Sequence, residues 1–206
     1  MKKILVIVGS GRKNGNTEQL ADAFILGAKE AGHFVKKISL STKFINGCTG
    51  CGVCRTEKQC IQNDDFNDIV PYIKTCDLLV FVSPLMYYQV SSRMKAFWER
   101  FYSCSEDAAM PEGGRIEIFP EKDCALLLNA EENEFWCFEQ AVSYYHMAVV
   151  QYMGFHDKGM LLAGGCGDRA GQPEIKETEF LMKAYEFGKN IYKENAYENE
   201  KSIINK

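Results

Sequence analysis

Four cysteines lie close together in the first third of the chain, at positions 48, 51, 54 and 60. The run C-x2-C-x2-C is the ferredoxin pattern in which thiolates wrap one corner of a cubane iron–sulfur cluster, although in ferredoxins the fourth nearby cysteine serves a different cluster. Here Cys60 is the nearest residue that could complete a set with Cys48, Cys51 and Cys54. Two alternatives stay open. One is structural zinc, which usually pairs two C-x2-C knuckles across a longer spacer, and the other is a group of unligated thiols.

A second chemical feature is the segment Gly9-Ser10-Gly11-Arg12-Lys13-Asn14-Gly15-Asn16-Thr17. It separates an apolar run from a helical pattern, with Asn16 as the expected N-cap. The N–H groups and positive dipole end of a helix N-terminus attract phosphate. Ser10 and Thr17 can add hydroxyl donors, and Arg12 a charge-assisted bond worth about 1.5–3 kcal/mol. The alternative is a plain strand-to-helix turn with a good cap.

Two familiar phosphate motifs do not fit this segment. Its glycine spacing, G-x-G-x-x-x-G, is one residue longer than the dinucleotide fingerprint, and Asn16 stands where a Walker A loop needs lysine. The loop therefore predicts a mononucleotide phosphate site, with Arg12 as its most important side chain.

Two further loops follow predicted strands. Ser83 to Gln89 comes directly after an apolar run, and Pro84 is expected to fix a turn there. A planar ring could lie against this segment, or Met86 and Tyr87 could be ordinary residues at the rim of the core. The third loop, Asn129 to Asn133, is equally consistent with a helix cap that carries acidic first-turn residues.

Composition narrows the function classes. The chain has 206 residues, nine cysteines, a formal net charge of −4 and a pI near 5.5, which provides no basic field for nucleic acid or anionic lipid. The odd cysteine number and the short N-terminal apolar run, Ile4 to Val8, argue against a secreted disulfide framework, a signal peptide or a membrane span. We therefore expect a cytoplasmic protein with no nucleic acid or membrane partner. The five scattered cysteines are expected to be small buried hydrophobes. Trp98 and Trp136 are expected in the core or at subunit contacts.

The apolar patterning predicts five strands that alternate with helices, hence an α/β domain with a doubly wound parallel sheet in three layers. The ligand should lie beyond the carboxyl ends of the strands. The domain is expected to cover residues 1–193, with a cysteine-rich loop at 41–63, an insertion at 104–120 and a polar tail at 194–206. The expected strands are 4–8, 34–40, 78–82, 124–128 and 159–163, and the expected helices 16–31, 64–74, 91–102, 133–153 and 174–192.

The chain resembles the NAD(P)H-dependent FMN reductase and iron–sulfur flavoprotein families. The likeness rests on Gly-Ser-x-Arg followed by Gly-Asn-Thr in the first loop, on Ser83-Pro84 followed by Met94-Lys95-Ala96-Phe97, and on the cysteine run followed by Asp64-Asp65. It implies a flavodoxin-like fold with strand order 2-1-3-4-5. By resemblance, Ser10, Arg12, Gly15, Asn16 and Thr17 hold the FMN phosphate. Pro84, Leu85, Met86, Tyr87 and Ala130 approach the rest of the flavin, and Cys48, Cys51, Cys54 and Cys60 hold a [4Fe–4S] cluster.

The resemblance also implies a function. FMN would accept hydride from NAD(P)H and pass electrons to a quinone, a flavin or another acceptor, so that the cofactor carries the chemistry and no catalytic side chain is assigned. The alternative is an electron carrier without a small-molecule substrate, reduced by ferredoxin through the cysteine loop. A homodimer or homotetramer is expected, because subunits of such families complete the flavin pocket together. A receiver-type domain is disfavoured because Ser83-Pro84 stand where it needs an acidic residue.

Overall fold

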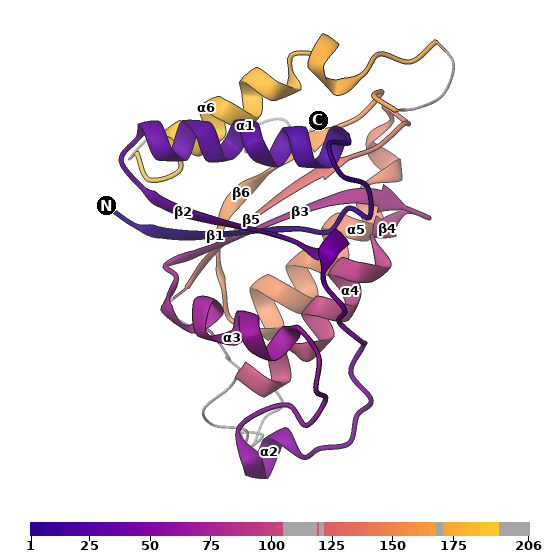
Figure 1. The fold of residues 1–206 in the computed structure, drawn as a ribbon. Helices are drawn as coiled ribbons and strands as arrows, with labels where there is room; N and C mark the ends of the chain where they lie inside the picture. Colours follow the sequence, from indigo (N-terminus) through magenta and orange to yellow (C-terminus); the bar gives the residue numbers. More distant parts are fainter. Residues whose placement is uncertain (105–118, 120–121, 168–170, 194–206) are drawn as a thin grey trace.

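In the part of the chain that the computed structural model describes, residues 1–104, 119, 122–167 and 171–193, five strands form a parallel sheet in the order β2-β1-β3-β5-β6 (Figure 1). This confirms the predicted fold class and, for the five long strands, the predicted order. A two-residue strand that was not predicted, β4, pairs antiparallel with the end of β3. The strands are β1 (Lys3–Val8), β2 (Phe34–Ser39), β3 (Leu78–Met86), β4 (Gln89–Val90), β5 (Asp123–Asn129) and β6 (His156–Ala163).

Helices cover both faces of the sheet, as Figure 1 shows. On one face α1 and α6 pack over Ile4, Val6 and Val8, and on the other α3, α4 and α5 pack over Leu5 and Ile7. This alternation along β1 is the reason why its sequence is apolar without interruption. The helices are α1 (Asn16–Glu30), α2 (Cys54–Glu57), α3 (Phe66–Thr75), α4 (Ser92–Glu99), α5 (Glu139–Tyr144) and α6 (Phe180–Asn190).

Helices α1 and α6 approach each other closely through two glycines. A Cβ on Gly27 would lie 2.0 Å from the carbonyl oxygen of Tyr185, and one on Gly188 would lie 2.1 Å from that of Phe24. Neither backbone could move away without separating the helices. The contact therefore holds α1 on the sheet, and with it the loop that precedes α1.

Several element boundaries differ from the predictions. The predicted helix 133–153 is instead a 3₁₀ turn at Phe135–Cys137, then α5, then a π-helical segment at Tyr145–Tyr152. The predicted insertion lies almost wholly outside the described residues, and so does the predicted polar tail. Within the described ranges, no helix has the length and apolar character needed to cross a membrane.

Candidate functional site

The loop between β1 and α1 lies at the carboxyl edge of the sheet, as predicted. The Gly9 N–H donates to the Val82 carbonyl, so the loop begins in contact with β3. Ser10, which is buried, accepts a 3.0 Å bond from the Arg12 N–H through Oγ, and this folds the loop back on itself. Asn14 has a positive φ of 56°, and its N–H donates to Glu18 Oε2 at 2.7 Å. The loop is therefore held in one shape by its own hydrogen bonds.

The start of α1 is suited to an anion. Gly15, and not Asn16 as predicted, is the N-cap, and no side chain caps the helix. The first N–H groups of a helix have no intrahelical acceptor and carry a partial positive charge. A Cβ on Gly11 would lie 3.3 Å from Nη1 of Arg93, so the Arg93 guanidinium lies against this loop. Arg12, whose Cβ lies 3.5 Å from where a Cβ on Gly15 would stand, and Arg93 are thus two cations of the loop that leads into an uncapped helix N-terminus. Sequence reasoning missed Arg93 because α4 brings it there from a distant part of the chain.

Two of the predicted phosphate ligands have other partners in this structure. The Thr17 hydroxyl, which is buried, donates a 2.6 Å bond to Oδ1 of Asn129 at the end of β5. Oδ1 of Asn16 accepts a 3.3 Å bond from the Ile175 N–H. These side chains tie the loop to β5 and to the segment before α6. Asn129 was missed as a loop partner, although a polar residue directly after an apolar strand was a signal available in the sequence.

The segment after β3 does not turn at Pro84, as the sequence predicted. Pro84 and Leu85 are part of β3, which extends to Met86, and the turn falls at Tyr87 and Tyr88. Both turn residues have positive φ, 52° and 63°. Two consecutive residues of this kind characterise the type I′ hairpin, which normally uses asparagine and glycine. Non-glycine residues in this conformation store strain, and such strain is concentrated at functional sites.

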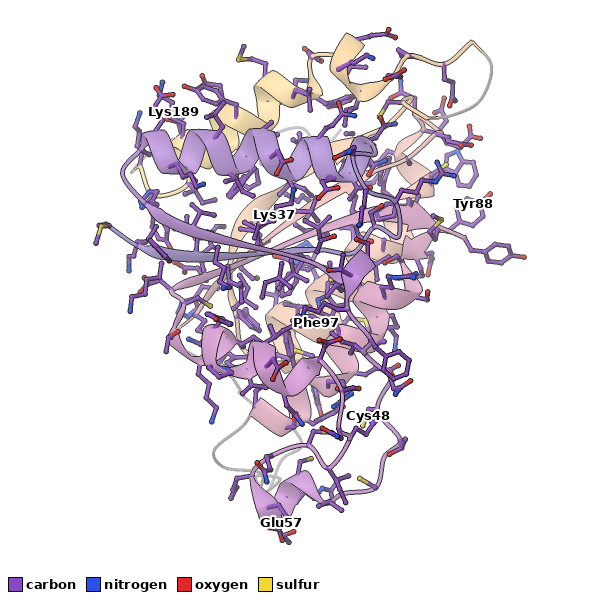
Figure 2. All side chains as sticks on the ribbon, viewed as in Figure 1. Lys37, Cys48, Glu57, Tyr88, Phe97 and Lys189 are labelled. Atoms are coloured by element: carbon purple, nitrogen blue, oxygen red, sulfur yellow. The ribbon has the colours of Figure 1, made fainter. Side chains whose placement is uncertain are left out.

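Aromatic side chains are exposed around this hairpin. Tyr87 is 99% exposed, and the Tyr88 ring lies 5.6 Å from the ring of Trp136. Figure 2 shows Tyr88 projecting at the end of β3 and β4. Trp136 is more than half exposed, so it is not a core residue, whereas Trp98 is fully buried as predicted.

The Ser83 and Ser91 hydroxyls join this segment to the first loop. Ser83 Oγ accepts from the Ser91 N–H at 2.9 Å, and Ser91 Oγ donates to the Gly9 carbonyl at 2.6 Å. Ala130 is buried, and its N–H donates to the Ala163 carbonyl while its own carbonyl accepts from Cys166. Ala130 therefore keeps only its methyl group for a contact with a ligand. The loops after β1, β3 and β5 thus meet at one edge, as the fold class predicts.

The four clustered cysteines lie in a different part of the molecule. Figure 2 shows Cys48 below the sheet, away from Tyr88, with Glu57 of α2 at the tip. All four cysteines line one open hollow. Its other wall comes from the end of α4 and the following 3₁₀ turn, η2 (Arg100–Cys104), and includes Glu99, Arg100 and Tyr102.

The cysteine loop is fastened to α4 and α3 on both sides. The Cys48 N–H donates to Glu99 Oε2 at 3.1 Å, and Glu99 in turn pairs with Lys95 at 2.5 Å. On the far side, Asn67 Nδ2 donates to the Cys60 carbonyl at 3.3 Å. The loop's two ends are therefore positioned by side chains of regular helices, which sequence reasoning did not identify.

The cysteine thiols have different environments. The pKa of Cys51 is lowered by the Val53 N–H and by the Thr49 hydroxyl, which stabilise the thiolate. The pKa of Cys54 is raised by burial and by the three other cysteines, whose negative charge would oppose a further thiolate. Ionised sulfurs this close repel one another, and a cationic centre between them would relieve that repulsion. The four cysteines are therefore suited to bind such a centre.

Among the described residues, no group of three or more histidine, cysteine or acidic side chains is placed to hold a single metal ion. The donor set is nevertheless suited to an iron–sulfur cluster, because four irons with their sulfides separate the thiolates farther than one ion does. The other five cysteines are buried and free, as expected.

A buried ion pair lies behind the cysteine hollow. Arg100 Nη1 donates to Oδ2 of Asp64 at 2.6 Å and to the Asn46 carbonyl at 3.0 Å, and both charged side chains are only 1% exposed. Burial lowers the pKa of Arg100, but the Asp64 carboxylate and the nearby Cys60 thiol outweigh this effect, so the net shift is upward. Asp64 also accepts from the Asn46 and Phe66 N–H groups. The pair therefore joins both flanks of the cysteine loop to η2.

Comparison with known proteins assigns the class. The sequence model of the NADPH-dependent FMN reductase family matches residues 2–111, which include the first loop, the cysteine run and the β3 hairpin. The chain belongs to this family.

Two relatives by sequence carry a more particular name. An iron–sulfur flavoprotein of Archaeoglobus fulgidus is 37% identical over 119 residues, which cover 57% of this chain and 54% of that protein. One of Methanocaldococcus jannaschii is 34% identical over 98 residues, 48% of this chain and 51% of that protein. The chain thus spans about half the length of these relatives.

Among solved structures, an NAD(P)H:quinone oxidoreductase of Methanothermobacter marburgensis is similar over 92% of this chain and 96% of its own, with a TM-score of 0.71 and 17% identity. At that identity the similarity supports the fold alone.

Proposed function

We propose that this chain is an FMN-dependent oxidoreductase that accepts electrons from NAD(P)H and passes them to a quinone, a flavin or another acceptor. The observation that carries the proposal is the uncapped N-terminus of α1, at the edge where the loops after β1, β3 and β5 meet, together with Arg12 in the loop that leads into it and the Arg93 guanidinium against that loop. Family membership supports the same cofactor.

In this proposal the first loop holds the FMN phosphate. N–H groups at Gly15, Asn16 and Thr17 and the guanidinium of Arg12 face the phosphate. Ser10 mainly shapes the loop, because its Oγ already accepts from the Arg12 N–H. The side chains of Asn16 and Thr17 fix the loop to its neighbours.

The segment Pro84 to Tyr87 lies along the isoalloxazine ring in this proposal, with Ala130 on the far side. The exposed rings of Tyr87, Tyr88 and Trp136 support it, because aromatic side chains can stack on a flavin. When bound, FMN supplies the hydride and electron transfer, while the protein supplies orientation and electrostatics. Such exposed rings also fit a homodimer or homotetramer in which a second subunit completes the pocket.

We further propose that Cys48, Cys51, Cys54 and Cys60 hold a [4Fe–4S] cluster. Their shared hollow and the two relatives named iron–sulfur flavoprotein support this. Nine free cysteines are consistent with the reducing conditions of a cytoplasm. In domain terms, residues 1–193 would form one FMN-binding domain with the cysteine loop 41–63 as its cluster-binding part.

The test is cofactor content in anaerobically purified protein. The proposal predicts about one FMN and, for a cubane cluster, about four iron and four acid-labile sulfide per chain. Cys54→Ser should lose the iron and sulfide and keep the flavin, whereas Cys76→Ala, at the end of α3, should keep both. Protein without flavin would contradict the reductase, and flavin without iron would remove the cluster alone.

The second candidate is an electron carrier reduced by ferredoxin, without a small-molecule substrate. The exposure of Cys48 and Cys51 favours it, because a partner protein could approach the centre directly. Reduction by ferredoxin together with no response to NADH or NADPH would select this function.

A further inference from the structure

Arg100 carries hydrogen-bond donors that no described residue accepts. Its side chain is 1% exposed, yet Nε and Nη2 have no hydrogen-bond partner. Asp64 and the Asn46 carbonyl engage only Nη1. Buried polar groups are nearly always satisfied, and an unsatisfied donor on a charged group is especially costly. Two such donors on one guanidinium therefore require an acceptor.

These two nitrogens form one edge of the planar guanidinium. Their N–H groups point in nearly the same direction, which is the arrangement that arginine uses to bind anions with two parallel bonds. Arg100 lines the cysteine hollow, and Cys60 is the one of the four clustered cysteines that acts on the charge of Arg100. The open edge thus belongs to the wall of the hollow and not to the Asp64 side.

Other charges face the same hollow. Glu99 lies beside Arg100 in the wall, but its carboxylate is already engaged by Lys95 and by the Cys48 N–H. Asp64 accepts three N–H groups and is buried behind the hollow. Arg100 therefore presents a positively charged edge with two N–H groups that have no acceptor. This edge lies next to thiols that become anionic when they bind a metal.

We propose that Arg100 is a positioning residue of the cysteine centre, whose Nε–H and Nη2–H donate to the Cys60 sulfur when Cys60 is a cluster ligand. This rests on the proposed cluster. Hydrogen bonds and positive charge near cluster sulfurs stabilise the electron-rich reduced state, and so raise the reduction potential. Asp64 holds the guanidinium in place from behind.

The experiment compares Arg100→Gln and Arg100→Lys with the unmodified protein, all reconstituted anaerobically. Arg55→Gln is the matched control, because Arg55 is an exposed cation on α2, within the same cysteine loop. Three quantities are measured: iron and sulfide per chain, the cluster midpoint potential by dithionite titration, and the change in Fe–S stretching frequencies after transfer to deuterium oxide. The last reports N–H···S hydrogen bonds directly, which a merely structural role would not affect.

We expect both Arg100 variants to show a more negative midpoint than the unmodified protein and to lose part of the deuterium sensitivity, while Arg55→Gln matches the unmodified protein. If Arg100→Gln does not assemble a cluster, Arg100→Lys decides, because it retains the charge and a partner for Asp64 but not the two-donor edge. Unchanged midpoint and unchanged deuterium sensitivity in a loaded Arg100→Lys protein would overturn the inference, as would an equal shift in Arg55→Gln. If the unmodified protein holds no iron or sulfide, the proposed cluster fails and this role fails with it. A loaded protein whose Arg100 variants are unaltered contradicts this role alone.

Discussion

Arg12 and Arg93 belong to the same loop region before α1, but Arg12 is part of the loop itself, whereas Arg93 reaches it from α4. The first was predictable, because an arginine among glycines directly before a helix has few structural uses. The second was not, since its position depends on how α4 packs on the sheet. Arg100 is a stronger example of a side chain whose position depends on tertiary packing and so could not be predicted from the sequence. The sequence Glu99-Arg100 looks like an exposed helix face, and only the tertiary contact with Asp64 makes it buried.

Removing the Arg12 guanidinium should weaken FMN binding with little effect on folding. A charge-assisted hydrogen bond is worth about 1.5–3 kcal/mol, so we expect Arg12→Ala to raise the FMN dissociation constant roughly 10- to 150-fold. Quenching of flavin fluorescence on binding measures this dissociation constant. Lys13→Ala removes the same charge from the same exposed loop and should change the constant less than about threefold. Equal losses in the two variants would show that the loop attracts phosphate only by its net charge.

At the scale of elements, the periodicity of the sequence located the five long strands, because continuous apolar runs are needed where both faces of a sheet are covered. The ends of elements were harder to predict. Asn16 lies inside α1 and does not cap it, and its side chain instead accepts from the N–H of Ile175, which is far away in the sequence. Pro84 is tolerated in β3 because pairing with β1 stops at Val82, so its missing N–H breaks no ladder bond on that side.

The β3–β4 hairpin offers a test of strain at the candidate flavin edge. Tyr87→Asn combined with Tyr88→Gly supplies the residues that a type I′ turn prefers. Since each left-handed non-glycine residue costs about 1–2 kcal/mol, we expect the free energy of unfolding in urea to rise by about 1–3 kcal/mol. The same variant should bind FMN more weakly, because the exposed rings are gone. Tyr87→Phe is the control, because it keeps both the aromatic ring and the strained backbone. Equal stability of the double variant and the unmodified chain would contradict the claim that the hairpin is strained.

For the whole molecule, ion pairs predict how stability responds to acid. The pKa of Glu18 is lowered by its hydrogen bond to Lys37 and by the Asn14 N–H, and the pKa of Asp65 is lowered by Lys43 and by the Phe44 N–H. A carboxyl group with a lowered folded-state pKa stabilises the fold above its ordinary value, and this contribution is lost as the pH falls below it. The ordinary values are 4.5 for Glu18 and 3.8 for Asp65.

We therefore expect the contribution of these two carboxyl groups to the free energy of unfolding to be steady from pH 7 to about pH 5 and to decrease progressively below about pH 4.5. Lys37→Met removes the partner of Glu18 and should make this decrease smaller, which urea unfolding at pH 7 and at pH 4 would measure. Lys158→Met, a cation of β6, serves as the control. An unaltered pH dependence in Lys37→Met would show that the pair does not couple stability to pH.

The central claim is that this chain binds FMN and that a nicotinamide nucleotide reduces it. The most direct measurement is anaerobic titration of the FMN-loaded protein with NADPH and, separately, with NADH, followed by flavin absorbance. We expect at least one nucleotide to bleach the flavin, and the unmodified protein to respond whether or not the cysteine centre is loaded. A flavin spectrum that neither nucleotide alters, in a protein whose flavin dithionite does reduce, would contradict the central claim.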